Sequence, residues 1–76
     1  MLFRSPNTVI TPMQIRMARA GLNISIQKLQ NLSGINATTI SYIENEKRSP
    51  LYRTMSELQD ALEKQGVTFI ENGVQI

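Results

Sequence analysis

The chain has 76 residues, a formal net charge of +2 and a hydrophobic fraction of 41%, which indicates one small domain near the lower size limit for a stable core. It contains no cysteine and no histidine, which excludes disulfide bonds and thiolate metal sites and removes the commonest general base. We therefore expect no metal, no cofactor and no enzymatic activity. Because no apolar run approaches the roughly 20 residues of a membrane span, we expect no membrane association and a cytoplasmic location.

The first predicted helix follows an N-terminal arm. Residues 1–10 show no clear hydrophobic period and are assigned to that arm. Thr11 and Pro12 then open a helix, because threonine caps a helix N-terminus and proline suits the first helical position. The helix is expected to run to about Ala20 and to close at Gly21.

Two short helices are predicted next, over about residues 26–32 and 37–45, with a bend at Ser33-Gly34. Ser25 and Asn36 can cap the two helix starts, and glycine permits the positive φ that such a bend needs. A helix held nearly perpendicular to a supporting helix can enter the major groove of DNA. The outward side of the second helix would present small or hydrogen-bonding side chains without charge: Ala37, Thr38, Ser41 and Tyr42.

A fourth helix is predicted over about residues 52–65 from its apolar spacing. Thr54 and Glu57 have the spacing of a capping box near its start, and Gly66 is expected to end it. Residues 11–66 would thus form one helical domain.

The last residues, 67–76, change to an alternating pattern that predicts two strands. Asn72-Gly73 predicts a type I′ hairpin turn, with positive φ at both positions. An isolated two-stranded hairpin is marginal in water, so it should lean on the fourth helix or on a partner's strand. We expect it to be the dimerisation element, either by edge pairing or by packing of Val67, Phe69 and Val74 across a two-fold axis.

The ordered series of motifs resembles the Cro/C1-type (XRE, lambda-repressor-like) helix-turn-helix family of bacterial and phage regulators. The resemblance covers about residues 11–66 and rests on Ile15-x-x-Ala18-Arg19, Ser25-x-x-x-Leu29, Ser33-Gly34-Ile35, Thr39-Ile40-Ser41-x-Ile43-Glu44 and Arg48-x-Pro50. The ending is similar to a subgroup of short members with an added hairpin. The resemblance implies an all-α domain of four main helices with a C-terminal β-hairpin. It also implies a homodimeric, sequence-specific transcriptional regulator that binds palindromic double-stranded DNA through helix 36–45.

The resemblance also implies roles for individual residues. Arg19 and Glu44 should form an ion pair that holds helices together without touching DNA. Ala37, Thr38 and Tyr42 should face base edges with Ser41 alongside, although Tyr42 has the alternatives of packing beside the core or stacking on the DNA backbone. The expected phosphate contacts are Gln27, Asn36, Asn45, Lys47 and Arg48. By contrast, Arg16, Lys28 and Arg53 are expected to be solvent-facing charges that do not contact DNA.

Two residues depart from the family pattern. Ile26 stands where the family commonly has a phosphate-bracing glutamine, and Gln30 stands where it favours alanine at a close helix crossing. Gln30 would either splay the helix pair or hydrogen-bond across it. The alternative function is therefore a helix-turn-helix fold used as a protein-interaction module, such as an antiactivator or antitoxin-like partner, with weak or no DNA binding. Regulation by a partner protein is compatible with either function.

Overall fold

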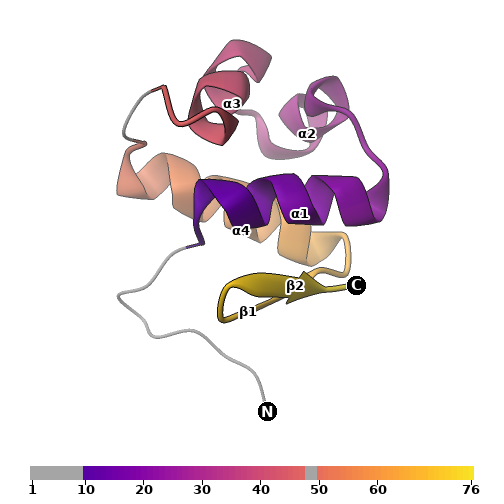
Figure 1. Cartoon of the computed structure of the whole chain (residues 1–76). Coiled ribbons are helices and arrows are strands. Elements are labelled where there is room, and N and C mark those ends of the chain that lie inside the picture. Colours follow the sequence, from indigo (N-terminus) through magenta and orange to yellow (C-terminus); the bar gives the residue numbers. More distant parts are fainter. Residues whose placement is uncertain (1–9, 48–49) are drawn as a thin grey trace.

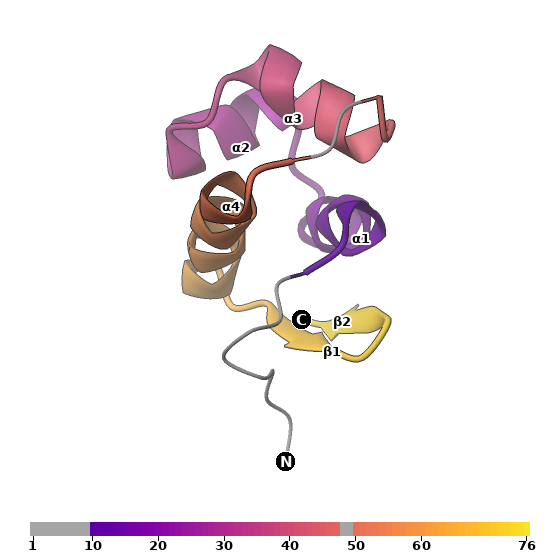
Figure 2. The ribbon, with the colours of Figure 1, turned by 90° about the vertical axis from the view of Figure 1, so that its left-hand side faces the viewer.

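The computed structural model describes residues 10–47 and 50–76 and consists of four helices followed by an antiparallel hairpin (Figure 1). The elements are α1 (Pro12–Leu22), α2 (Ile26–Ser33), α3 (Ala37–Glu44), α4 (Tyr52–Lys64), β1 (Thr68–Ile70) and β2 (Gly73–Gln75). Helices α2 and α3 lie on one side of α1 and α4, and the hairpin lies on the other side in both side views (Figures 1 and 2). The expected mostly helical fold with a C-terminal hairpin is confirmed.

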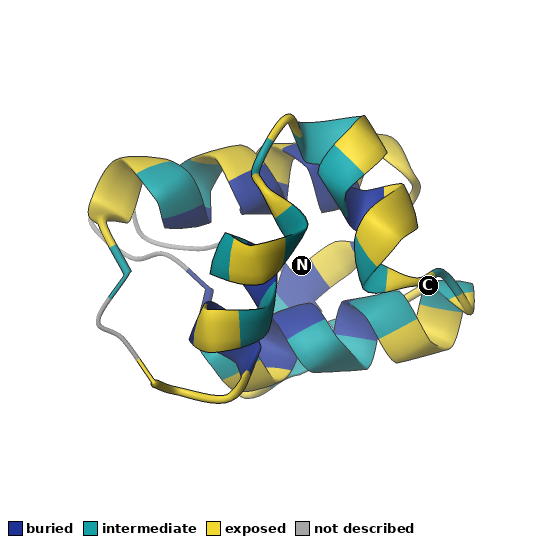
Figure 3. Cartoon of the chain, turned by 90° about the horizontal axis from the view of Figure 1, so that it is seen from above, coloured by how far each residue is buried: buried dark blue, intermediate teal, exposed yellow. Residues whose placement is uncertain are grey.

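The core lies where all four helices and the hairpin meet. Its buried apolar side chains include Ile15, Ala18, Leu29, Ile40, Ile43, Met55, Leu58, Leu62, Val67 and Phe69. Viewed from the α2–α3 side, the buried segments face inward and the outer surfaces of these helices are mostly exposed or intermediate (Figure 3). Ile10 is also buried, and its N–H donates to the buried Gln59 Oε1 at 3.3 Å, so the end of the expected arm belongs to the core.

The first helix begins as predicted and ends two residues later. Thr11 Oγ1 accepts a hydrogen bond from Gln14 N, and Gln14 Oε1 accepts one from Thr11 N, which completes a capping box. Gly21 does not close the helix. Asn23 does so instead with φ 58°, because asparagine tolerates left-handed geometry and its N–H can bond back to Ala20 O.

The two-helix unit follows the prediction closely. Ser25 Oγ accepts from Lys28 N, and Asn36 Oδ1 accepts from Thr38 N, so both residues cap their helices. Gly34 has φ 79° and terminates α2 at the bend.

The predicted capping box of the fourth helix is wrong. The helix begins at Tyr52, with Leu51 at its N-cap and no side-chain hydrogen bond there. Thr54 and Glu57 therefore lie inside the helix, where Glu57 pairs with Arg53 one turn earlier.

The hairpin turn lies one residue earlier than predicted. Phe69 pairs with Val74 and Ile70 with Gly73, so the turn residues are Glu71 and Asn72. Of these only Asn72 has positive φ, at 61°, while Gly73 lies in β2. A type I′ turn at Asn72-Gly73 therefore does not form, because the observed pairing puts Gly73 inside the ladder.

The hairpin is held by its own chain. Val67 and Phe69 are buried and Val74 packs against the core. The expectation that these three side chains pack across a dimer axis must be revised, since two of them are already covered within a single chain.

Candidate nucleic-acid interface

The C-terminal end of α3 is tied to α1 by an ion pair. Arg19 Nε and Nη2 each donate to one carboxylate oxygen of Glu44, both at 2.9 Å, which is the bidentate geometry. Glu44 is 3% exposed, and Arg19 also donates to Ile24 O at 3.1 Å. The hydrogen bonds that Arg19 donates to Glu44 raise the pKa of Arg19, which keeps this guanidinium charged. The pair anticipated from the family pattern is thus present as a contact between helices.

A second arginine reaches the same helix end, so the expectation that Arg16 is a solvent-facing charge is wrong. Arg16 Nη1 donates to the backbone oxygen of Glu44. A cation at a helix C-terminus also interacts favourably with the negative end of the helix dipole. The signal was present in the spacing, since residues 16 and 19 lie on the same face of a helix and therefore point at the same neighbour.

The N-terminal end of α3 is held by two amide side chains. Gln30 Oε1 accepts from Ala37 N at 2.7 Å, and Asn36 Oδ1 accepts from Thr38 N at 2.8 Å. Of the two alternatives left open for Gln30, it therefore hydrogen-bonds across the helix pair.

The outward side of α3 carries the four side chains expected to meet bases. Thr38 is exposed, Tyr42 is 42% exposed, and Ala37 and Ser41 are half-buried. Alanine, threonine, serine and tyrosine bear no charge near neutral pH, so this strip of α3 is neutral and offers hydroxyl and methyl groups.

The residues expected to contact phosphate differ in whether their side chains are already engaged. Gln27 and Lys47 are exposed, whereas Arg48 lies outside the described residues. The Asn36 and Asn45 side chains are exposed but already engaged, because Asn36 caps α3 and Asn45 Nδ2 donates to Ser41 O at 2.9 Å.

Helix α3 ends in a Schellman motif. Lys47 N bonds to Tyr42 O at 2.9 Å and Glu46 N to Ile43 O at 3.0 Å. Glu46 occupies the left-handed position of this motif with φ 56°, a conformation that glycine adopts most easily.

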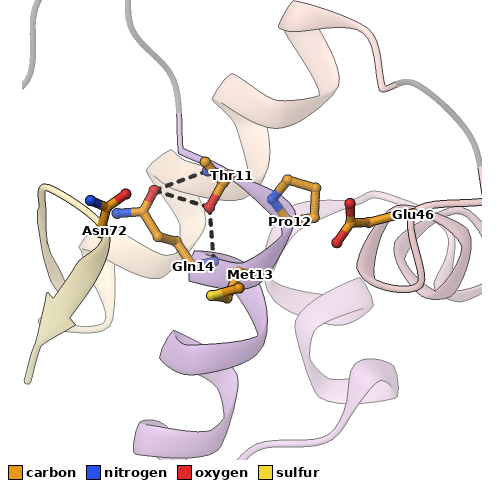
Figure 4. A pocket seen from close by; sticks show the side chains of 6 residues that line it. All are labelled: Thr11, Pro12, Met13, Gln14, Glu46 and Asn72. Atoms are coloured by element: carbon orange, nitrogen blue, oxygen red, sulfur yellow. Dashed lines mark hydrogen bonds between the residues drawn. The ribbon is translucent and has the colours of Figure 1, made fainter.

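A shallow pocket opens where the start of α1 meets Glu46 and the hairpin turn (Figure 4). It is lined by Thr11, Pro12, Met13, Gln14, Glu46 and Asn72. Thr11 Oγ1 and Gln14 Oε1 bond to each other at 3.4 Å and to the backbone, so these polar atoms serve the capping box (Figure 4). Among the residues that the structure describes, no group of metal-ligating side chains is found and no helix is long and apolar enough to cross a membrane.

Comparison with known families agrees with this geometry. The family model described as Helix-turn-helix, of the Cro/C1 (XRE) type, matches residues 15–65, which include α2, α3, α4 and all of α1 except its first three residues. A search of curated proteins gives no significant match. Because the matched region covers well over half of the chain, the protein belongs to the Cro/C1-type helix-turn-helix family, whose members bind DNA and are not enzymes.

Proposed function

We propose that this protein is a sequence-specific transcriptional regulator of the bacterial or phage type, which inserts α3 into the major groove of double-stranded DNA. The observation that carries the proposal is the placement of α3. Arg16 and Arg19 hold its C-terminal end, Gln30 holds its first N–H, and its outward strip is neutral. A helix that is fixed at both ends and presents small polar groups suits base reading.

The four outward side chains have matching chemistry for base edges. The hydroxyl of Thr38 can donate or accept, and its methyl group can contact the methyl of thymine. Ala37 offers an apolar thymine contact, and Ser41 lies alongside on the next turn. The ring of Tyr42 reaches either a base edge or the sugar-phosphate backbone. None of these is the bidentate arginine–guanine contact, so DNA shape also contributes to recognition.

The phosphate contacts are proposed around this strip. Lys47 and Arg48 supply charge, and Gln27 supplies a neutral donor at the start of α2. Asn36 would donate through Nδ2, because its Oδ1 already accepts from Thr38 N. Asn45 would have to share an amide that bonds to Ser41, which makes it the weakest of these contacts.

A homodimer on a palindromic operator follows from the size of the reading element. One helix of 8 residues contacts few base pairs, and two copies about 34 Å apart read half-sites one helical turn apart. The folded chain measures 34 × 24 × 18 Å, so two copies side by side fit this spacing.

The hairpin supplies an edge for such an arrangement. It lies opposite α2 and α3 across the α1–α4 layer (Figures 1 and 2). Packing two hairpins face to face would direct the α3 helices away from each other, whereas edge-to-edge pairing leaves both on one side. We therefore place the dimer contact at the strand edges, because an open strand edge is a ready template for pairing.

The function is tested by selecting bound sequences from a pool of random duplex DNA and measuring their affinity against salt. We expect an enriched two-fold symmetric sequence and affinity that falls roughly a hundredfold between about 50 and about 200 mM salt, if Lys47 and Arg48 of both copies neutralise phosphates. Enrichment of no sequence, together with salt-independent binding, would contradict the proposal.

The protein-interaction module remains the competing function because free positive charge is scarce. Two of the arginines, Arg16 and Arg19, bind Glu44 of α3, and their charges are therefore not available for phosphate. The salt titration separates the two functions, since a protein-only module has no counterions to release from DNA. As a DNA-binding regulator the protein would act in the cytoplasm, with control by abundance or by a partner protein.

A further inference from the structure

Gln30 of α2 makes a hydrogen bond at each end of the bend between α2 and α3. The backbone oxygen of Gln30 accepts from Gly34 N at 2.8 Å, and its side-chain Oε1 accepts from Ala37 N at 2.7 Å. The Gln30 side chain is only half-buried, so this second bond spans the bend at the surface of the unit.

The bond fixes the end of α3 that the arginines do not reach. Arg16 and Arg19 both act at Glu44, the last residue of α3. Asn36 caps α3 from within its own chain segment and therefore does not fix α3 against α2. Among the described hydrogen bonds, the Gln30 contact is the one that joins α2 to the first turn of α3, and it adds to the apolar packing between the two helices.

We propose that Gln30 is a positioning residue for DNA reading: its amide oxygen holds the first turn of α3, and with it Ala37 and Thr38, in register with the bases. This inference rests on the proposed function and deepens it. Recognition contacts need placement to about 0.5 Å, which packing of a half-buried helix end does not guarantee. The same bond removes the Ala37 N–H from the donors that a phosphate could use.

The variants separate the acceptor from the shape of the side chain. Gln30→Met keeps the length and removes the acceptor, whereas Gln30→Glu keeps an acceptor at a helix N-terminus, where negative charge is favoured. Asn31→Leu is the matched control, because it also replaces an amide by an apolar group of similar shape on exposed α2 surface. The readout is the ratio of affinities for a selected target and for random duplex DNA, with the salt slope.

Gln30→Met should lower this ratio about fivefold with the salt slope unchanged, the size expected for one lost hydrogen bond. Gln30→Glu should keep the ratio while weakening binding to both DNAs alike, because its charge repels phosphate. Asn31→Leu should behave as the parent protein. If Gln30→Met left the ratio of affinities for selected and random DNA unchanged, the inference would be overturned. It would also be overturned if Gln30→Glu lowered this ratio while the Ala37 amide stayed protected from hydrogen exchange.

If Gln30→Met does not fold, Gln30→Ala takes its place, because alanine is the residue the family pattern favours here. A parent protein that selects no target contradicts the proposed function itself. A parent protein that discriminates, with a Gln30→Met or Gln30→Ala variant that discriminates equally well, contradicts only the role of Gln30.

Discussion

At the scale of single residues, Glu46 holds a strained backbone conformation at the C-terminal end of α3. Its φ of 56° places a side chain with a Cβ in the left-handed region. Its carboxylate also stands next to Lys47, in the segment proposed to meet phosphate. Glu46 is therefore expected to lower both the stability of the fold and the proposed affinity for DNA.

Glu46→Gly should raise the free energy of unfolding by about 1 kcal/mol, because glycine adopts this conformation without a steric cost. Urea denaturation measures the change. Asn23→Gly is the matched control, since Asn23 has φ 58° in an equivalent helix-end position but carries a residue that tolerates it. We expect the control to gain less. A loss of stability in Glu46→Gly would show that the Glu46 side chain makes a compensating contact.

The Arg19–Glu44 pair is an ion pair with a buried carboxylate, so the loss of one partner should be costly. Arg19→Met leaves the buried Glu44 carboxylate without its charged partner, which should cost about 3–5 kcal/mol of unfolding free energy. Adding Glu44→Gln should recover part of this cost, and a double-mutant cycle in urea measures the coupling. Arg53→Met removes the exposed pair with Glu57 and should change stability by no more than about 0.5 kcal/mol.

The raised pKa of Arg19 makes the free energy of unfolding no more dependent on pH near neutrality. A pKa raised by folding contributes stability that is present below the unfolded-state pKa and is lost as pH rises through the folded-state pKa. For Arg19 that window lies in strongly alkaline solution.

If Arg19→Met and Arg53→Met lowered the free energy of unfolding equally, the structural role of the buried Arg19–Glu44 pair would be contradicted.

At the scale of elements, the hairpin depends on Gln14. Its Nε2 donates to Ile70 O at 2.6 Å and to Gly73 O at 3.0 Å, on either side of the turn. Its Oε1 meanwhile serves the capping box of α1. One buried amide therefore joins the first helix to the last element of the chain.

Gln14→Glu separates these two roles. A glutamate still accepts from Thr11 in the capping box, but it cannot donate to the two strand carbonyls. We expect faster amide hydrogen exchange across β1 and β2 with little change in the first turn of α1, and a loss of about 1–3 kcal/mol in unfolding free energy. Gln75→Glu, at an exposed position of β2, is the control for the added charge. If Gln14→Glu and Gln75→Glu changed hydrogen exchange and unfolding free energy equally, Gln14 would not be the residue that holds the hairpin to α1.

The same elements show what sequence alone can establish. The caps at Thr11, Ser25 and Asn36 were predictable, because a cap depends on residues within three positions of it. The hairpin turn was misplaced, and the partner of Arg16 was missed although its spacing to Arg19 was visible, because the contacts involved join residues more than twenty-five positions apart along the chain. The α4 capping box failed for another reason: its spacing also occurs inside a helix.

At the scale of the whole molecule, the proposed dimer depends on the open strand edge. Thr68→Lys places a charge on an exposed edge position, which should block pairing with a second copy while leaving the buried Phe69 face intact. We expect the parent protein to sediment as a dimer and this variant as a monomer with unchanged helical circular dichroism. Asn31→Lys adds the same charge on α2, opposite the hairpin (Figure 1), and should remain dimeric.

Removing the hairpin is a poorer test of the dimer. Truncation after Gly66 would delete Val67 and Phe69 from the core, so a monomeric product would report lost folding as much as lost pairing. A Thr68→Lys variant that still sediments as a dimer would exclude the edge of β1 as the dimer contact.

The reading of DNA by α3 is tested most directly by replacing Thr38 and Tyr42 together with alanine. The measurement compares affinities for a selected target and for random duplex DNA, on variants with the parent's helical circular dichroism. The account predicts that discrimination falls at least about tenfold, while binding to random DNA and its salt slope persist. Discrimination equal to that of the parent protein would show that another surface reads the target.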